Sequence, residues 1–141
     1  MTDTPVVHLQ VTIDVPLSTA VNAVVGAMEG GYSPWIHSFH PTKDPESIAA
    51  IAAKPEGEIW YSSETFWRLG GRAVLTYDGP EEEEGEGESS HTVDLLGLSL
   101  ALNRMNKVAP RHFADLVGEN DDAITHDVFM QMTVFEEIIY G

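Results

Sequence analysis

AITHDVFMQMTVFEEII, residues 123–139, is the stretch that decides the fold. Its apolar residues recur at helical spacing and form one broad stripe: Ile124, Val128, Phe129, Met132, Val134, Phe135 and Ile139. Asp121 or Asp122 stands just before it and can cap its first turn. A helix this apolar packs on more than one side. We therefore expect it at the centre of the fold or in a dimer interface.

Strand patterns lie upstream of this helix. Residues 7–14 alternate, with Val7, Leu9, Val11 and Ile13 on one side of the chain, which predicts a half-buried strand. Further strands are expected just after Trp35 and at three later segments: 58–61, 72–77 and 91–93. These segments together predict a small antiparallel sheet of four or five strands.

Helix signals fill most of the remaining chain. One helix is expected from Pro16 to the glycines 30–31, where Gly can take the left-handed turn that ends a helix. Asp94 can cap a second helix, and Pro110 can open a short third one. Residues 48–53 predict a helical turn or two. The fold class is thus α+β: one domain over 1–141, its sheet packed against three or four helices.

Charge and composition limit the possible functions. The chain has 23 acidic against 7 basic residues and a formal charge of −16, which disfavours binding to nucleic acid or to anionic membranes. Six glutamates lie in a low-complexity tract at 79–90, where we expect a disordered hairpin tip. This acidity indicates either simple solubility or a surface that imitates nucleic acid. With no secretion signal and no apolar run of about 18 residues, a cytoplasmic location is expected.

No catalytic or metal-binding pattern stands out. The chain has no cysteine, and none of its six histidines has a partner at a recognised zinc-ligand spacing. Nucleophile elbows and phosphate-cradling glycine loops are absent from the sequence. Helix capping is a sufficient explanation for Asp121, Asp122 and Asp127. We therefore expect a binding protein with no metal and no cofactor, rather than an enzyme.

Aromatic and arginine residues are the more suggestive feature. The aromatics gather in turns and short strands: Tyr32, Trp35, Trp60, Tyr61, Phe66 and Trp67. Four of the seven cations are arginines at 68, 72, 104 and 111. Aromatic rings that stack on a base and arginines that pair with phosphate are what a nucleotide ligand requires. The alternative is that the rings form the core and the arginines pair locally with Glu64, Asp94 or Asp115.

Two separated motifs resemble a family of small proteins encoded by phages and prophages. The first is AMEGGYSPW at 27–35, and the second is the tail from 111 to 141 with its DVFMQ and FEEIIYG segments. The middle of the chain, 38–70, shows no resemblance. Two departures could alter a ligand pocket: Ser33-Pro34 replaces a polar–aromatic pair, and Glu136 stands where the family usually has glycine.

The characterised proteins that the chain most resembles are phage sponges that counter the Thoeris defence. This resemblance implies a homodimer or larger assembly that sequesters cyclic ADP-ribose-type signals or cyclic oligonucleotides, uncleaved, in the cytoplasm of an infected bacterium. The ligand-binding positions that it implies are Tyr32, Trp35, Arg111, Phe113, Asn120, Asp122 and Asp127. An acidic inhibitor of a nucleic-acid-binding host defence protein is the alternative hypothesis.

Overall fold

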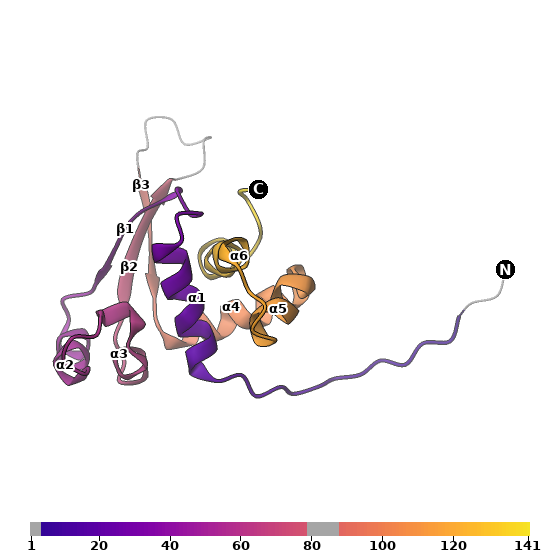
Figure 1. Cartoon of the computed structure of the whole chain (residues 1–141), viewed down its shortest axis with the longest axis horizontal. Coiled ribbons are helices and arrows are strands. Elements are labelled where there is room, and N and C mark those ends of the chain that lie inside the picture. Colours follow the sequence, from indigo (N-terminus) through magenta and orange to yellow (C-terminus); the bar gives the residue numbers. More distant parts are fainter. Residues whose placement is uncertain (1–3, 79–87) are drawn as a thin grey trace.

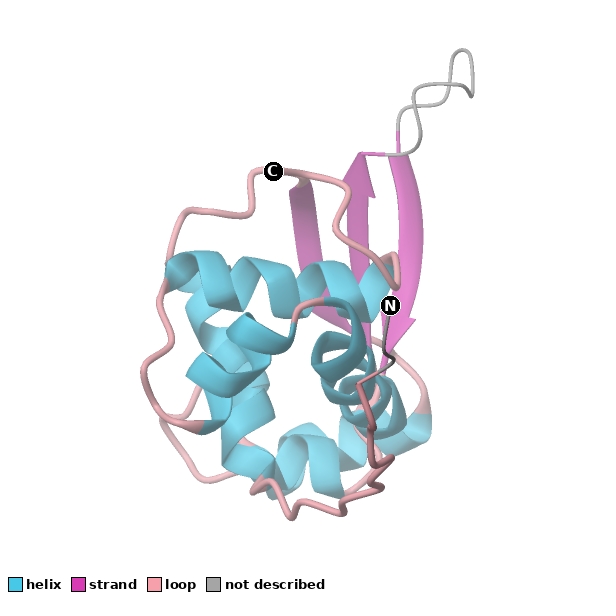
Figure 2. Ribbon diagram, turned by 90° about the vertical axis from the view of Figure 1, so that its right-hand side faces the viewer, coloured by secondary structure: helices cyan, strands magenta, loops and turns pink. Residues whose placement is uncertain are grey.

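The computed structural model describes residues 4–78 and 88–141. Within them an antiparallel sheet of three strands, in the order β1-β2-β3, carries helices on one face (Figures 1 and 2). The strands are β1 (Ile36–Pro41), β2 (Ala73–Asp78) and β3 (Glu88–Val93). The helices are α1 (Leu17–Glu29), α2 (Pro45–Ala53), α3 (Glu64–Arg68), α4 (Leu95–Val108), α5 (Pro110–Val117) and α6 (Ala123–Val134). The α+β class is confirmed, with fewer strands and more helices than expected.

The sheet has two chemically different faces. Small polar side chains, including Thr76, Ser90 and Thr92, occupy the outer face, whereas Leu75 and Val93 are fully buried on the inner face. Outer-face β1 residues Ser38 and His40 pair with Thr76 and Val74. One wet face and one covered face are typical of an antiparallel sheet, and they explain the alternation along β2 and β3.

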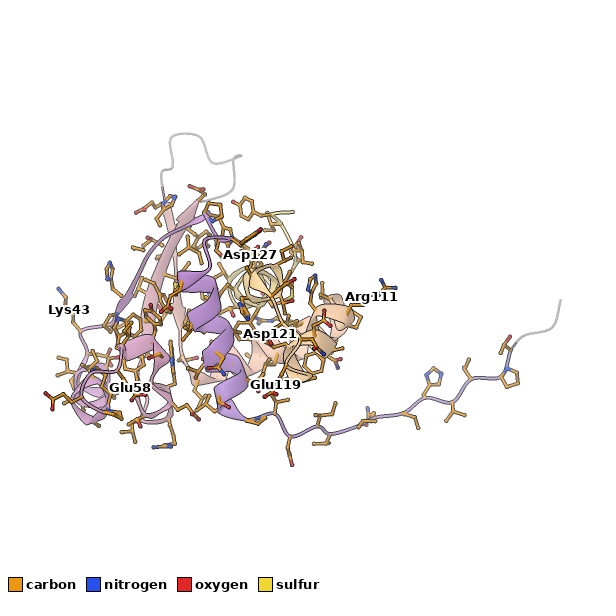
Figure 3. The ribbon with its side chains drawn as sticks, viewed as in Figure 1. Lys43, Glu58, Arg111, Glu119, Asp121 and Asp127 are labelled. Carbon is orange, nitrogen blue, oxygen red and sulfur yellow. The ribbon has the colours of Figure 1, made fainter. Side chains whose placement is uncertain are left out.

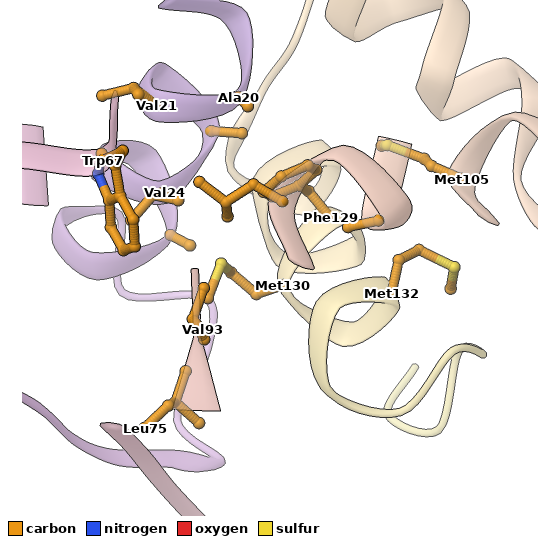
Figure 4. Packing of buried hydrophobic residues seen from close by; sticks show 14 of the residues in the cluster. Ala20, Val21, Val24, Trp67, Leu75, Val93, Met105, Phe129, Met130 and Met132 are labelled. Carbon is orange, nitrogen blue, oxygen red and sulfur yellow. The ribbon is translucent and has the colours of Figure 1, made fainter. Parts of the chain in front are cut away.

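Helix α6 lies at the centre of the domain. Every residue from Asp127 to Thr133 is buried, and α6 contacts α1, α4 and α5. Side chains of α1, β2, β3 and α6 meet in the core, among them Val24, Leu75 and Phe129 (Figure 4). Gly26 of α1 lets the two helices approach, because a Cβ there would overlap the His126 ring. The sequence predicted the last helix either at the centre of the fold or in a dimer interface, and the structure shows it at the centre of the fold.

Four expectations about secondary structure were wrong. Residues 7–14 are extended and exposed but pair with no described strand, since they run away from the sheet (Figure 1). Residues 58–61 form no strand; Trp60–Ser62 is a 3-10 turn, and Ser63 then caps α3 by accepting a hydrogen bond from the Phe66 N–H. The last helix ends at Val134, not near Ile139, because Glu136 takes a left-handed φ of 65°. Residues 88–90 of the expected acidic loop belong to β3, and 79–87 lie outside the described residues.

The expected helix starts and stops are largely confirmed. Asp94 accepts a hydrogen bond from the Gly97 N–H, and Asp122, rather than Asp121, accepts one from the Thr125 N–H. Gly31, just past α1, has a φ of 76°, which explains the glycine there. Among the described residues, no helix has the length and apolar character to cross a membrane.

Candidate functional site

The turn after α1 points two polar donors at α6. Gly31 reverses the chain, and Ser33 and Trp35 are then buried against the helix. The Ser33 hydroxyl donates to Asp127 Oδ1 over 2.6 Å, and the Trp35 indole N–H donates to the same oxygen over 2.8 Å. The turn is thereby attached to the centre of the domain by a buried carboxylate.

Gln131 attaches the C-terminal tail to the same helix. It lies one turn after Asp127 and donates from Nε2 to Asp127 Oδ2 over 2.8 Å. Its Oε1 accepts the backbone N–H groups of Ile139 and Tyr140 at 2.7 and 2.9 Å, and its Nε2 also donates to the Tyr140 carbonyl at 2.9 Å. A fully buried amide that satisfies a tail in this way fixes the tail against the turn.

Four aromatic rings pack around this polar network. We call Trp35, Tyr77, Phe135 and Tyr140 the tail cluster. Trp35 stacks on Tyr140 with ring centres 5.9 Å apart and contacts Phe135 at 5.0 Å, while Phe135 meets Tyr77 edge-on at 5.2 Å. The strand, the turn and the tail therefore meet at one place.

Two adjoining cavities open at this junction. The first has a volume of about 350 Å³, and its walls are Tyr32, Pro34, Trp35, Asp78, Asp127, Tyr140 and Gly141. The second, of about 250 Å³, shares Tyr32, Asp127, Tyr140 and Gly141 with it and extends to His112 and Ile138. We call the pair the turn–tail cavity. Taken singly, the two volumes lie at or just below the lower end of the roughly 300–1,000 Å³ that is typical of small-molecule sites.

Negative charge dominates the walls of the turn–tail cavity. Asp127 and Asp78 contribute carboxylates, and none of the described residues that line it is a lysine or an arginine. Outside the wall, the His37 ring contacts Asp78 at 2.6 Å and Glu88 at 2.7 Å. The Glu88 hydrogen bond, and then the Asp78 charge, raise the pKa of His37. Asp78 and Glu88 thus favour the protonated form of the His37 ring beside them.

Three of the seven candidate residues come together here: Tyr32, Trp35 and Asp127. The other four lie elsewhere. Arg111 is exposed on the outer side of α5 (Figure 3), and Asn120 is exposed in the loop before α6. Asp122 caps α6, and its bonds to Thr125 lower its pKa. Phe113 lines a separate hollow of about 240 Å³ between α4, α5 and residues 11–15.

The other arginines and aromatic residues noted from the sequence also lie away from the cavity. Arg72 pairs with Asp44 at 3.0 Å, and Arg104 pairs with Glu136 at 3.1 Å, so both have local acidic partners, though not those considered from the sequence. Trp60, Tyr61, Phe66 and Trp67 pack together with Phe39 at the other end of β1. Of the aromatic residues noted from the sequence, Tyr32 and Trp35 line the cavity.

Ser33, Gln131 and Tyr140 are site residues that were not selected from the sequence. Gln131 follows Asp127 by four residues on a helix, so the two share a face, and that spacing is the signal that could have identified it. Ser33 is one of the two departures from the family motif, and here it supplies a donor to Asp127. Nothing local in the sequence marks the return of Tyr140.

No protein-family model, no curated protein and no solved structure matches this chain. The residues of the cavity therefore carry the functional inference.

The arrangement is suited to holding a ligand. An ionised carboxylate offers about four lone-pair positions, and three donors already occupy Asp127, so about one acceptor position is left at the cavity wall. No group of three or more histidine, cysteine or acidic side chains gathers as a metal site in residues 4–78 and 88–141. The cavity can orient a hydrogen-bond donor beside aromatic rings.

Proposed function

We propose that this is a non-catalytic binding protein that sequesters a nucleotide-derived immune signal in its turn–tail cavity, as an anti-defence protein of the phage kind that its motifs resemble. One observation carries the proposal. Tyr32, Trp35 and Asp127, which lie on both motifs of the resemblance, converge with Tyr140 on a cavity of about 350 Å³. A planar, hydrogen-bonding group is the ligand chemistry that these walls complement.

Each aromatic wall has a distinct role in this proposal. Trp35 is only 3% exposed and already stacks on Tyr140, so it shapes the wall and positions Asp127. Tyr32 is 59% exposed at the mouth of the cavity and offers a ring face to a base. Stacking a base on such a ring contributes about 1–3 kcal/mol to binding.

The wall charge determines which end of a nucleotide enters. Phosphate would be repelled by Asp127 and Asp78, whereas an exocyclic amine or a ribose hydroxyl can donate to them. The base and sugar therefore occupy the cavity, and the phosphates point outward. A volume of about 350 Å³ suits one nucleoside unit, so the rest of a cyclic signal extends beyond this cavity or contacts a second copy.

Titration calorimetry with a cyclic ADP-ribose, a cyclic dinucleotide and free adenosine tests the proposal. One of the cyclic signals should bind stoichiometrically, and mass spectrometry after denaturation should recover it intact. Tyr32→Ala should weaken binding about tenfold or more, whereas Leu69→Ala, a similarly exposed residue, should not. Recovery of a cleaved ligand, or no binding of any of the three, would refute the proposal.

The overall charge of −16 favours a second candidate, an acidic inhibitor of a nucleic-acid-binding host protein. Salt separates the two. Binding through surface charge should weaken steeply as ionic strength rises, because the Debye length falls from about 10 Å at 0.1 M to about 3 Å at 1 M. Ligand binding in the turn–tail cavity should change far less.

A further inference from the structure

Residues 4–15, which we call the arm, have the sequence pattern of a strand but no strand beside them. Val7, Leu9, Val11 and Ile13 alternate with polar residues, and these four are 83%, 78%, 73% and 57% exposed. The arm leaves the foot of α1 and extends away from the domain (Figure 1). Apolar side chains in regular alternation are suited to covering one face of a sheet.

The sheet has an open edge that matches this pattern. Within the described residues β3 pairs only with β2, so its outer edge presents unpaired backbone groups. It contains neither proline nor a register shift. The opposite edge is less suitable, because β1 ends in Pro41 and has a bulge between Ile36 and Ser38.

Helix α4, which begins two residues after β3 ends, carries exposed apolar side chains near its start. Leu96, Leu100 and Arg104 follow one another at intervals of four and so share one side of the helix. Leu96 and Leu100 are 66% and 42% exposed. A strand added to β3 would bring its apolar side chains toward Leu96, at the start of this helix.

The polar side of the arm matches the outer face of the sheet. His8, Gln10 and Thr12 would continue the row of Ser90 and Thr92 on β3. Both faces of an added arm would therefore have the environment that their side chains require.

The base of the arm points away from the β3 edge of its own chain. Val11, Ile13 and Val15 lie along a hollow formed by Ser99, Leu102 and Asn106 of α4, together with Phe113. In Figure 1 the arm runs from the foot of α1 past α5, away from the three strands. The arm would have to reverse its direction to reach its own β3.

We propose that the arm adds as a fourth strand to β3 of a second copy of this chain. If the exchange is reciprocal, it closes into a dimer in which each sheet has four strands. The proposal stands independently of the ligand, since none of its residues lines the turn–tail cavity.

Sedimentation velocity over a range of concentrations tests the exchange. The wild-type chain should sediment with the mass of two chains. Leu9→Glu with Val11→Glu should weaken association about a hundredfold or more, because two buried apolar contacts are lost. The matched control, Gln10→Glu with Thr12→Glu, adds the same charge on the polar side and should retain association. A monomeric wild type, or equal effects of the two pairs, would overturn the proposal.

Disulfide trapping identifies the partner strand. The chain has no cysteine, so a Gln10→Cys chain mixed with a Thr92→Cys chain should form a mixed disulfide under mild oxidation. Cross-links from Thr12→Cys and His8→Cys establish the register. If a chain with both substitutions cross-links only within itself, at dilutions where it is monomeric, the arm folds back and the exchange is wrong.

Discussion

Two aromatic clusters lie along β1, and two residues of one of them, Trp35 and Tyr140, line the turn–tail cavity. The foot cluster, formed by Phe39, Trp60, Tyr61, Phe66 and Trp67, packs with ring centres as close as 5.0 Å. In this cluster the Trp67 indole N–H donates to the Tyr61 carbonyl at 3.0 Å, and the Tyr61 hydroxyl donates to Glu29 at 2.8 Å. The tail cluster packs as closely but lies against a buried carboxylate and a cavity.

The difference shows what separates core from site. Both clusters contain tryptophan and tyrosine, so residue type alone does not distinguish them. In the foot cluster the rings fill the space between β1, α3 and the 3-10 turn. In the tail cluster the Trp35 ring donates to Asp127 and the Tyr140 backbone N–H donates to Gln131, and the turn–tail cavity lies beside these two residues. A hydrogen-bond network that fixes the residues around a cavity is typical of a binding site.

The largest effect should come from truncating one tryptophan in each cluster. Trp67 is fully buried and Trp35 is 3% exposed, so Trp67→Ala and Trp35→Ala should each lower the free energy of unfolding by about 3–5 kcal/mol. Urea unfolding measures this. Ligand affinity should distinguish the two variants. Trp35→Ala should no longer bind the ligand, whereas Trp67→Ala should still bind it under conditions in which the variant is folded. Equal affinity losses would mean that the clusters do not differ in function.

Removing the Asp127 carboxylate should have the next largest effect. Asp127→Ala leaves Ser33, Trp35 and Gln131 with unused donors, at a cost of about 3 kcal/mol in unfolding free energy. Hydrogen exchange should show faster exchange at Ile139 and Tyr140, because Gln131 loses its anchor. Asp78→Asn is the control: it removes the other wall carboxylate, which is exposed, and should change stability by no more than about 0.5 kcal/mol. Unchanged tail protection in Asp127→Ala would contradict this account.

Sequence reasoning succeeded where the cause is local. Asp94 and Asp122 cap helices through bonds to residues three positions away, and the alternation along β2 reflects a two-faced sheet. It failed where the cause is distant. The arm alternates as well as β2 does, yet pairing depends on which strand lies beside it.

The site shows the same limit. The resemblance selected Tyr32, Trp35 and Asp127. The structure brings them together although Asp127 lies more than 90 positions after the other two in the sequence. Gln131 and Tyr140 escaped selection because the bonds that join them depend on a tail that turns back after α6. That reversal depends on Glu136, a residue type that rarely adopts a positive φ.

Strain in the tail predicts a smaller, stabilising change. Glu136 has a φ of 65°, where a side chain costs about 1–2 kcal/mol and glycine does not. Glu136→Gly also loses the 3.1 Å pair with Arg104, but Glu136 is largely exposed and such pairs contribute about 0.5 kcal/mol. The unfolding free energy should therefore rise by about 1 kcal/mol. Glu136→Ala keeps the strain and loses the pair, so it should be less stable than wild type; a glycine variant no better than the alanine variant would disprove the strain.

The smallest effect concerns pH at the edge of the tail cluster. Glu88 and Asp78 hold the pKa of His37 above its ordinary 6.5, so protonated His37 stabilises the fold fully below that value. This stabilisation is lost as pH rises through the higher pKa of the folded state. Thermal melting at about pH 6 and about pH 8 should show it, and an NMR titration should place the His37 pKa above 6.5. His37→Gln should reduce the dependence, whereas His40→Gln, on the outer face of the same strand, should leave it intact. If both variants melt with the wild-type pH profile, the His37 pairs contribute nothing to the fold, and the edge of the cavity carries no pH dependence from this histidine.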